Sequence, residues 1–207
     1  MVTTIALLGA GRIGKVHAKA IAEDKRARLV AVADAMAPGA AAIAEATGAK
    51  VMTIDEIEAD AGIDAVIICT PTNTHADLIE RFARAGKAIF CEKPVDLDVA
   101  RARACADVVK QLGGRVMLGF NRRFDPHFLA VRKAIDDGRI GDVEMVTIVS
   151  RDPGPPPAEY IKVSGGMFRD MTIHDFDMAR FLLGEEIATV SGTASVLVNP
   201  EIGALGD

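Results

Sequence analysis

The order of segments in the first 34 residues constrains the fold of this chain more than any other feature. An apolar run at residues 4–8 leads directly into the glycine-rich sequence Gly-Ala-Gly-Arg-Ile-Gly at residues 9–14. An amphipathic stretch follows, and a second apolar run at residues 29–33 ends at Asp34. This order predicts a strand, a tight turn, a helix and a second strand closed by an acid, which is the layout of a dinucleotide-binding site.

The three glycines of the turn have separate expected roles. Gly9 permits the tight turn after the strand, Gly11 lets a pyrophosphate approach the backbone because it has no Cβ, and Gly14 lets the helix pack on the strand. The helix N-terminus offers free N–H groups to phosphates, so Arg12 and Ile13 are also predicted to contact the cofactor. The alternative is a glycine turn of some other α/β protein.

The acid at the end of the second strand indicates which dinucleotide binds. Asp34 lies 34 − 14 = 20 residues after Gly14, where a carboxylate can bind the ribose hydroxyls. Ala35 and Met36 follow it, and neither could neutralise a 2′-phosphate. We therefore expect NAD and not NADP as the cofactor.

Composition excludes several other classes of protein. The 207 residues carry a formal net charge of −5, which argues against a nucleic-acid or membrane-surface partner. No apolar run approaches the roughly 18 residues of a membrane span. Because the N-terminus lacks a basic leader, we expect a cytoplasmic protein. The cysteines, Cys69, Cys91 and Cys105, lie in apolar sequence and are expected to be buried thiols.

Strands and helices alternate through residues 1–120, the predicted NAD-binding domain. The predicted strands cover residues 4–8, 29–33, 50–52, 65–69, 88–91 and 116–118. The predicted helices cover residues 13–21, 37–46, a short segment capped by Asp55, 75–85 and 98–112. This alternation predicts an α/β fold with a doubly wound parallel sheet of the Rossmann type.

The pattern changes near residue 120, where we place a domain boundary. Residues 126–137 and 171–183 are predicted helices, and the proline-rich residues 152–157 are predicted to form a loop. Residues 143–151 alternate in polarity and, like residues 187–198, are predicted to form a strand. Residues 121–207 are therefore expected to form a partial α+β domain with an open mixed sheet.

One cluster of polar residues follows the predicted strand at residues 88–91. Glu92 and Lys93 would lie at the carboxyl end of a parallel strand, which faces the ligand crevice. Pro94 fixes this lysine, and we consider a cis Lys93–Pro94 bond. A surface ion pair between Glu92 and Lys93 is the alternative.

A second cluster lies within residues 165–175. Asp170 and His174 are four residues apart and would share one face of a helix. Near the helix N-terminus the dipole favours a neutral imidazole, so His174 could act as a base. The alternatives are Asp170 as a helix N-cap with a solvated His174, or a metal site, for which further ligands are missing nearby.

Two further segments could contribute to the site. Thr70, Pro71, Asn73 and His75 follow a strand and could line the nicotinamide ribose, although Thr72 or Asn73 could instead cap a helix. In the segment at residues 121–125, an arginine could bind substrate or cofactor, or could pair with Asp125.

Taken together, these motifs resemble the Gfo/Idh/MocA oxidoreductase family, and within it the bacterial inositol dehydrogenases. The matching segments are GAGRIG, Asp34, CTPTNTH, EKP, NRRFD, GGMFRDMTIHDFDMARFLLG and the terminal VLVNPEIGALGD. The resemblance implies NAD-dependent oxidation of a polyol hydroxyl to a ketone, with myo-inositol as the expected substrate. Another sugar substrate, or a non-catalytic dinucleotide-binding module, is the alternative.

The resemblance also implies residue roles. His174 would take the proton of the substrate hydroxyl, and Lys93 would stabilise the charge that develops on its oxygen. Asp170 would bind a neighbouring hydroxyl, Arg123 would contact the polyol, and Glu92 would contact the cofactor. No metal is implied. Family members are longer than this chain, so we expect a truncated second domain and, for the full-length protein, a homo-oligomer, either a dimer or a tetramer.

Overall fold

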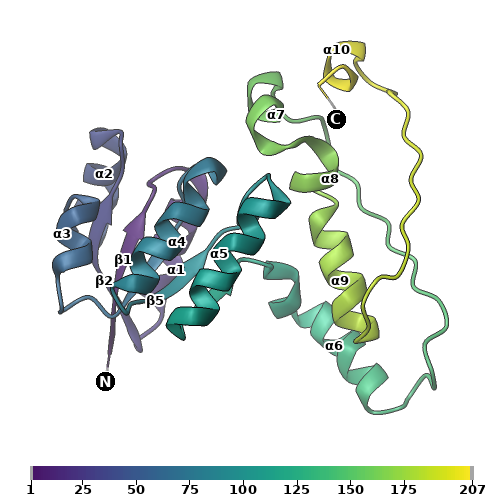
Figure 1. Ribbon diagram of the computed structural model, residues 1–207, viewed down its shortest axis with the longest axis horizontal. Helices are drawn as coiled ribbons and strands as arrows, with labels where there is room; N and C mark the ends of the chain where they lie inside the picture. The colour runs from purple at the N-terminus through teal and green to yellow at the C-terminus, as the bar shows by residue number, and fades with distance from the viewer. Residues whose placement is uncertain (1, 206–207) are drawn as a thin grey trace. The chain divides into compact units, whose positions relative to one another are not determined.

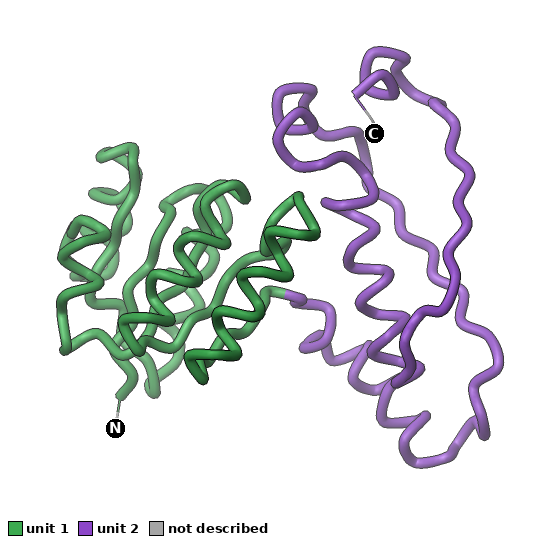
Figure 2. The backbone as a smooth tube through the Cα atoms, in the orientation of Figure 1, with its two compact units in different colours: residues 1–119 green, residues 120–207 purple. Residues whose placement is uncertain are grey.

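A computed structural model of the chain describes residues 2–205. The chain divides into two compact units, Met1–Gly119 and Phe120–Asp207, which are drawn in different colours in Figure 2. The last two residues of the terminal sequence motif, Gly206 and Asp207, lie outside the described residues. Each unit is considered by itself.

A parallel sheet of six strands forms the centre of the first unit. The strands are β1 (Thr3–Leu8), β2 (Ala27–Ala33), β3 (Lys50–Val51), β4 (Ala65–Ile68), β5 (Ala88–Cys91) and β6 (Val116–Leu118). Their order is β3-β2-β1-β4-β5-β6, and every pair is parallel. Successive strands are added outward from β1 to β3 on one side and from β4 to β6 on the other, so the winding direction changes between β1 and β4. The ligand crevice is expected beyond the carboxyl ends of these two strands. The predicted doubly wound sheet is confirmed.

Helices cover both faces of this sheet (Figure 1). They are α1 (Arg12–Glu23), α2 (Ala37–Thr47), α3 (Ile54–Ala59), α4 (His75–Arg84) and α5 (Val99–Leu112), with a short 3-10 turn, η1 (Thr72–Thr74), before α4. Apolar side chains of α1 and α2 pack on one face, and those of α3, α4 and α5 pack on the other.

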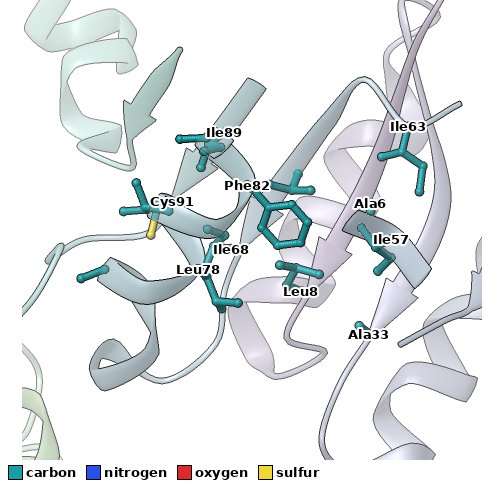
Figure 3. Close-up of a cluster of buried hydrophobic side chains, with 14 of the residues drawn as sticks. Ala6, Leu8, Ala33, Ile57, Ile63, Ile68, Leu78, Phe82, Ile89 and Cys91 are labelled. Carbon is teal, nitrogen blue, oxygen red and sulfur yellow. The ribbon is translucent and has the colours of Figure 1, made fainter. Parts of the chain in front are cut away.

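The central strands β1, β4 and β5 are largely apolar because helices cover both faces of the sheet there. Leu7 packs with the side chains of α1 and α2, whereas its neighbour Leu8 packs with Phe82 and Leu78 of α4. Successive side chains of a strand point to opposite faces, so each strand serves two cores. Figure 3 shows Phe82 among Leu8, Ile57 and their neighbours, and its ring is fully buried.

The start of α3 differs from the prediction that Asp55 caps it. The N-cap is Thr53, whose Oγ1 accepts a hydrogen bond from the Glu56 backbone N–H at 3.2 Å. The Glu56 carboxylate in turn accepts from the Thr53 N–H at 2.7 Å. This reciprocal capping box satisfies two helix-terminal donors, which a cap at Asp55 could not do. Asp55 therefore lies in the first turn.

The second unit is built from helices joined by long extended segments (Figure 1). Its elements are the 3-10 turn η2 (Asn121–Phe124), α6 (Pro126–Asp136), α7 (Ala158–Ser164), α8 (Gly166–Asp170), α9 (Ile173–Leu183) and α10 (Pro200–Gly203). The helix predicted at residues 171–183 is confirmed as α9, which begins two residues later because residues 171–172 form a turn.

The strands predicted at residues 143–151 and 187–198 do not form, because neither segment joins a sheet ladder within residues 2–205. Polarity alternation marks a segment that can bury one face, but a strand also needs a hydrogen-bonded neighbour. Side chains on both segments are exposed, such as Met145 at 83% and Leu197 at 89%. The open mixed sheet expected for the second domain is thus absent from the described residues.

The three cysteines are free and buried, as predicted. Burial raises the pKa of the Cys69 thiol to about 12 and also raises the pKa of the Cys91 and Cys105 thiols. Since the thiolate is the reactive form, all three are expected to stay inert in the folded protein at pH 8.

We predict that a thiol-reactive dye at pH 8 labels none of the three cysteines in the native protein and labels all three after unfolding in guanidinium chloride. The measurement is the time course of dye release with and without denaturant. Rapid labelling of Cys69 or Cys91 in the native protein would contradict the burial and the raised pKa described above.

Candidate functional site

Only glycine fits at two positions where β1 leads into α1: Gly9 in the connecting turn and Gly14 in the first turn of the helix. Gly9 has φ +96°, and a Cβ on it would lie 2.5 Å from the carbonyl oxygen of Cys69. A Cβ on Gly14 would lie 2.1 Å from the carbonyl oxygen of Gly9. Gly11 differs, because nothing lies within 4 Å of the position its Cβ would take. The backbone is therefore tightly packed around Gly9 and Gly14, whereas the Cβ position of Gly11 faces open space.

The N-terminus of α1 adds backbone donors to this open side. Gly11 is the N-cap and supplies no side-chain hydrogen bond, and α1 runs from Arg12 for 12 residues. The first N–H groups of a helix have no intrahelical partner, and the helix dipole favours an anion at this end. An exposed backbone with free donors and no Cβ fits a pyrophosphate.

Asp34 is fixed beside the same turn. Its Oδ2 accepts a hydrogen bond from the Ala10 N–H at 2.5 Å, and its Oδ1 accepts from the Met36 N–H at 2.6 Å. Each carboxylate oxygen keeps a further lone pair that can accept a ribose hydroxyl. The turn, the helix end and Asp34 together fit a dinucleotide, and the Ala10 contact was not evident from the sequence.

The predicted residues after β4 and β5 lie at the carboxyl edge of the sheet. Thr70 shares a hydrogen bond of 2.6 Å with Thr74 through their hydroxyl oxygens, and Pro71 and Asn73 are exposed. Neither Thr72 nor Asn73 caps α4, because both lie inside η1 and the N-cap residue is Thr74. The capping alternative is therefore wrong.

His75 occupies the core beneath this edge and is only 2% exposed. Its Nδ1 lies 2.7 Å from the carbonyl oxygen of Pro94, and its Nε2 lies 2.8 Å from the carbonyl oxygen of Thr70. The Lys93–Pro94 bond is cis, as considered from the sequence. Both ring nitrogens of His75 thus lie against backbone carbonyl oxygens of the two loops.

Glu92 interacts with a histidine that the sequence analysis missed. Its Oε1 lies 2.7 Å from Nε2 of His17 on α1, and both side chains are about four-fifths buried. The His17 ring packs edge-on against Phe90 with centroids 5.1 Å apart. Gly119 makes room for the carboxylate, since a Cβ there would lie 2.8 Å from Glu92 Oε2. The Glu92 carboxylate thus has a largely buried partner, His17, that lies on another element of the sheet's unit.

In the second unit, Asp170 and His174 lie on different helices and not on one shared face. Asp170 ends α8, while His174 is the second residue of α9. The helical register shifts between them because the N–H groups of Met171 and Thr172 both donate to the Met167 carbonyl oxygen. Asp170 is consequently not the N-cap of α9, whose N-cap is Thr172.

Each of these two residues has a neighbour within the second unit. The Tyr160 hydroxyl donates to Asp170 Oδ1 at 3.0 Å, and Asp170 lines a hollow of about 580 Å³. The His174 ring lies edge-on to Phe120, with centroids 6.3 Å apart. Gly165 and Gly166, with φ of +89° and +73°, form the turn that leads into α8.

The arginines of η2 pair with acids of α9. The Arg123 Nε and Nη2 donate to Asp177 at 2.8 and 2.6 Å, which raises the pKa of the guanidinium, and Arg122 pairs with Asp175. Asp125 instead caps α6 by accepting from the backbone, so the predicted alternative of an Arg–Asp125 pair is wrong. The sequence pattern gave Asp175 and Asp177 no role, because they lie more than 50 residues away from the arginines.

Residues 2–205 offer neither a metal site nor a membrane-spanning helix. They contain no group of His, Cys, Asp and Glu side chains placed to hold a metal ion. Over the same residues, no helix combines the length and apolarity needed to cross a membrane.

Comparison with known proteins identifies the family. Residues 3–120 match the profile described as an oxidoreductase family with an NAD-binding Rossmann fold, and residues 128–204 match the GFO/IDH/MocA C-terminal domain. The chain belongs to the Gfo/Idh/MocA oxidoreductase family. The first unit is thus an NAD-binding Rossmann domain, in agreement with its strand order and its glycine turn.

Individual relatives narrow the comparison. The chain is 70% identical to the inositol 2-dehydrogenase of Rhizobium meliloti over all 207 residues, which cover 63% of that protein. The crystal structure of a myo-inositol dehydrogenase from Corynebacterium glutamicum matches with a TM-score of 0.94 at 47% identity, over 100% of this chain and 62% of that one. A scyllo-inositol dehydrogenase from Lactobacillus casei, solved with NAD(H) and scyllo-inositol, matches with a TM-score of 0.90 at 32% identity, over 100% and 63%. The chain therefore spans less than two thirds of these relatives.

We predict that Gly11→Ala and Gly14→Ala weaken NAD binding in different ways. In Gly11→Ala the methyl group faces open space, so the melting temperature should stay unchanged while NAD affinity falls at least about tenfold. In Gly14→Ala the methyl group meets the Gly9 carbonyl, so stability and affinity should both fall. Calorimetric titration with NAD and thermal unfolding measure the two effects. Unchanged NAD affinity in Gly11→Ala would contradict the predicted approach of the pyrophosphate.

Proposed function

We propose that this chain catalyses the NAD-dependent oxidation of a ring hydroxyl of inositol to a ketone, with myo-inositol as the substrate. The observation that carries this proposal is the 70% identity, over the whole chain, with a relative named inositol 2-dehydrogenase. Residues of each unit support it: in the first unit the β1–α1 turn and Asp34 fit a dinucleotide, and the side chains of Lys93, and of Asp170 and His174 in the second unit, are of types suited to a polyol.

The bound cofactor would supply the hydride acceptor. In the proposed roles, His174 removes the proton from the reacting hydroxyl, and its place in the first turn of α9 favours the neutral imidazole that a base needs. Lys93 donates a hydrogen bond to the reacting oxygen and stabilises its developing negative charge. Asp170 accepts a hydrogen bond from a neighbouring hydroxyl.

We propose a different role for Arg123 from the polyol contact that the resemblance implied. Two of its nitrogens donate to the nearly buried carboxylate of Asp177, and its guanidinium lies 5.4 Å from the centroid of the Phe181 ring. A guanidinium held in this bidentate way fixes η2 on α9. Its contribution to substrate binding would be through the placement of α9.

The proposal also includes the cellular compartment and the oligomeric state of the protein. Three free buried thiols suit a reducing compartment, so we place the reaction in the cytoplasm. Exposed apolar side chains of the second unit, such as Val149 and Val198, suit contacts between subunits, so we propose a homo-oligomer, either a dimer or a tetramer.

We predict that the purified chain, mixed with NAD and myo-inositol, produces NADH, and that His174→Asn lowers kcat by about 10²–10⁴-fold, as expected for loss of a general base. Absorbance of NADH measures the rate, and scyllo-inositol and glucose are tested beside myo-inositol. The matched control is His127→Asn, which replaces an exposed histidine of α6 in the same unit and should leave kcat unchanged.

Two outcomes would contradict these assignments. If the chain binds NAD but turns over no polyol, the proposed activity is wrong for this chain. If His174→Asn keeps the kcat of the unmodified chain, the assignment of the base is wrong.

A further inference from the structure

His75 joins two loops that follow neighbouring strands. It is the first residue of α4, it is 2% exposed, and its two ring nitrogens reach the carbonyl oxygens of Thr70 and Pro94. Thr70 comes after β4, and Pro94 comes after β5, next to Lys93.

The chemistry of these contacts explains why a histidine stands here. A carbonyl oxygen only accepts, and a neutral imidazole carries a single N–H, so the neutral ring donates to one of the two carbonyl oxygens while its other nitrogen lies beside the second. The two nitrogens lie on different sides of a rigid ring, which lets one side chain span a gap between two backbone segments. A glutamine can offer both of its N–H groups only from a single nitrogen, and a leucine of similar size offers none.

We infer that His75 is a positioning residue for the nicotinamide half of the cofactor site. By tying the Thr70 and Pro94 carbonyl groups together, it holds the backbone of Lys93 in place at the carboxyl edge of β5. This inference rests on the proposed function, in which Lys93 acts beside the nicotinamide. His75 itself, being buried beneath the loops, contacts neither cofactor nor substrate.

The other half of the cofactor site does not depend on His75. The adenosine and pyrophosphate side is formed by the β1–α1 turn and by Asp34, which is fixed by Ala10 and Met36. A defect limited to the Thr70 and Pro94 loops should therefore weaken ligands that contain nicotinamide and spare ADP-ribose, which lacks it. A general loss of stability would weaken both ligands together.

The experiment measures Kd for NADH and for ADP-ribose in the full chain and its variants. We expect His75→Leu to raise the Kd for NADH about tenfold while the Kd for ADP-ribose stays within about twofold. His75→Gln, which keeps a donor, should recover part of the NADH affinity. This variant also keeps the inference testable if His75→Leu fails to fold.

The matched control is Cys105→Ala. Cys105 is 1% exposed on α5 and donates a weak hydrogen bond to the Ala76 carbonyl oxygen, so its loss disturbs the same end of α4 without touching either loop. It should lower the melting temperature and leave the ratio of the two Kd values unchanged.

Two results would overturn the inference. Equal changes in both Kd values for His75→Leu and His75→Gln, or no change in either, would show that His75 does not position the nicotinamide site. Failure of the unmodified chain to bind NADH more tightly than ADP-ribose would overturn the proposed function, and the inference would fall with it.

Discussion

The close approach of Gly14 to the Gly9 carbonyl oxygen is the constraint on which the rest of the first unit depends. It seats the start of α1 directly on the end of β1, where an added methyl group would lie only 2.1 Å from that oxygen. The helix placed in this way begins with free N–H groups, and Asp34 accepts a hydrogen bond from Ala10 just before it. The geometry that fits a phosphate thus depends on backbone packing together with the Asp34 carboxylate, which accepts from Ala10 in the same turn.

Three histidine and carboxylate contacts link this turn to the other end of the crevice. Asp34 accepts a hydrogen bond from Ala10 in the turn, and His17 of α1 contacts Glu92, which follows β5. His75 contacts the loops that follow β4 and β5. Each link is partly or fully buried, where a hydrogen bond is worth more than in water. The crevice is therefore held together by polar contacts laid over an apolar sheet.

Much of this arrangement could be predicted from the sequence, because it follows from local spacing. The glycine turn, Asp34 and the alternation of strands with helices are patterns within about 35 residues, and the predicted sheet formed. The His17–Glu92 contact joins residues 75 apart, and Arg123–Asp177 joins residues 54 apart, so no local pattern reveals them. Polarity alternation at residues 143–151 showed a segment able to bury one face but could not show whether a neighbouring strand is present.

The ion pairs between η2 and α9 affect how variation in this segment should be interpreted. Residues 174–177 combine two roles: His174 is the proposed base, while Asp175 and Asp177 anchor the helix to Arg122 and Arg123. Variants of Arg123 made in search of new substrates would also lose its contact with Asp177 and so shift α9, which carries the proposed base His174. A change of substrate specificity in such variants would then come from a displaced α9 and not from a new contact between residue 123 and the substrate.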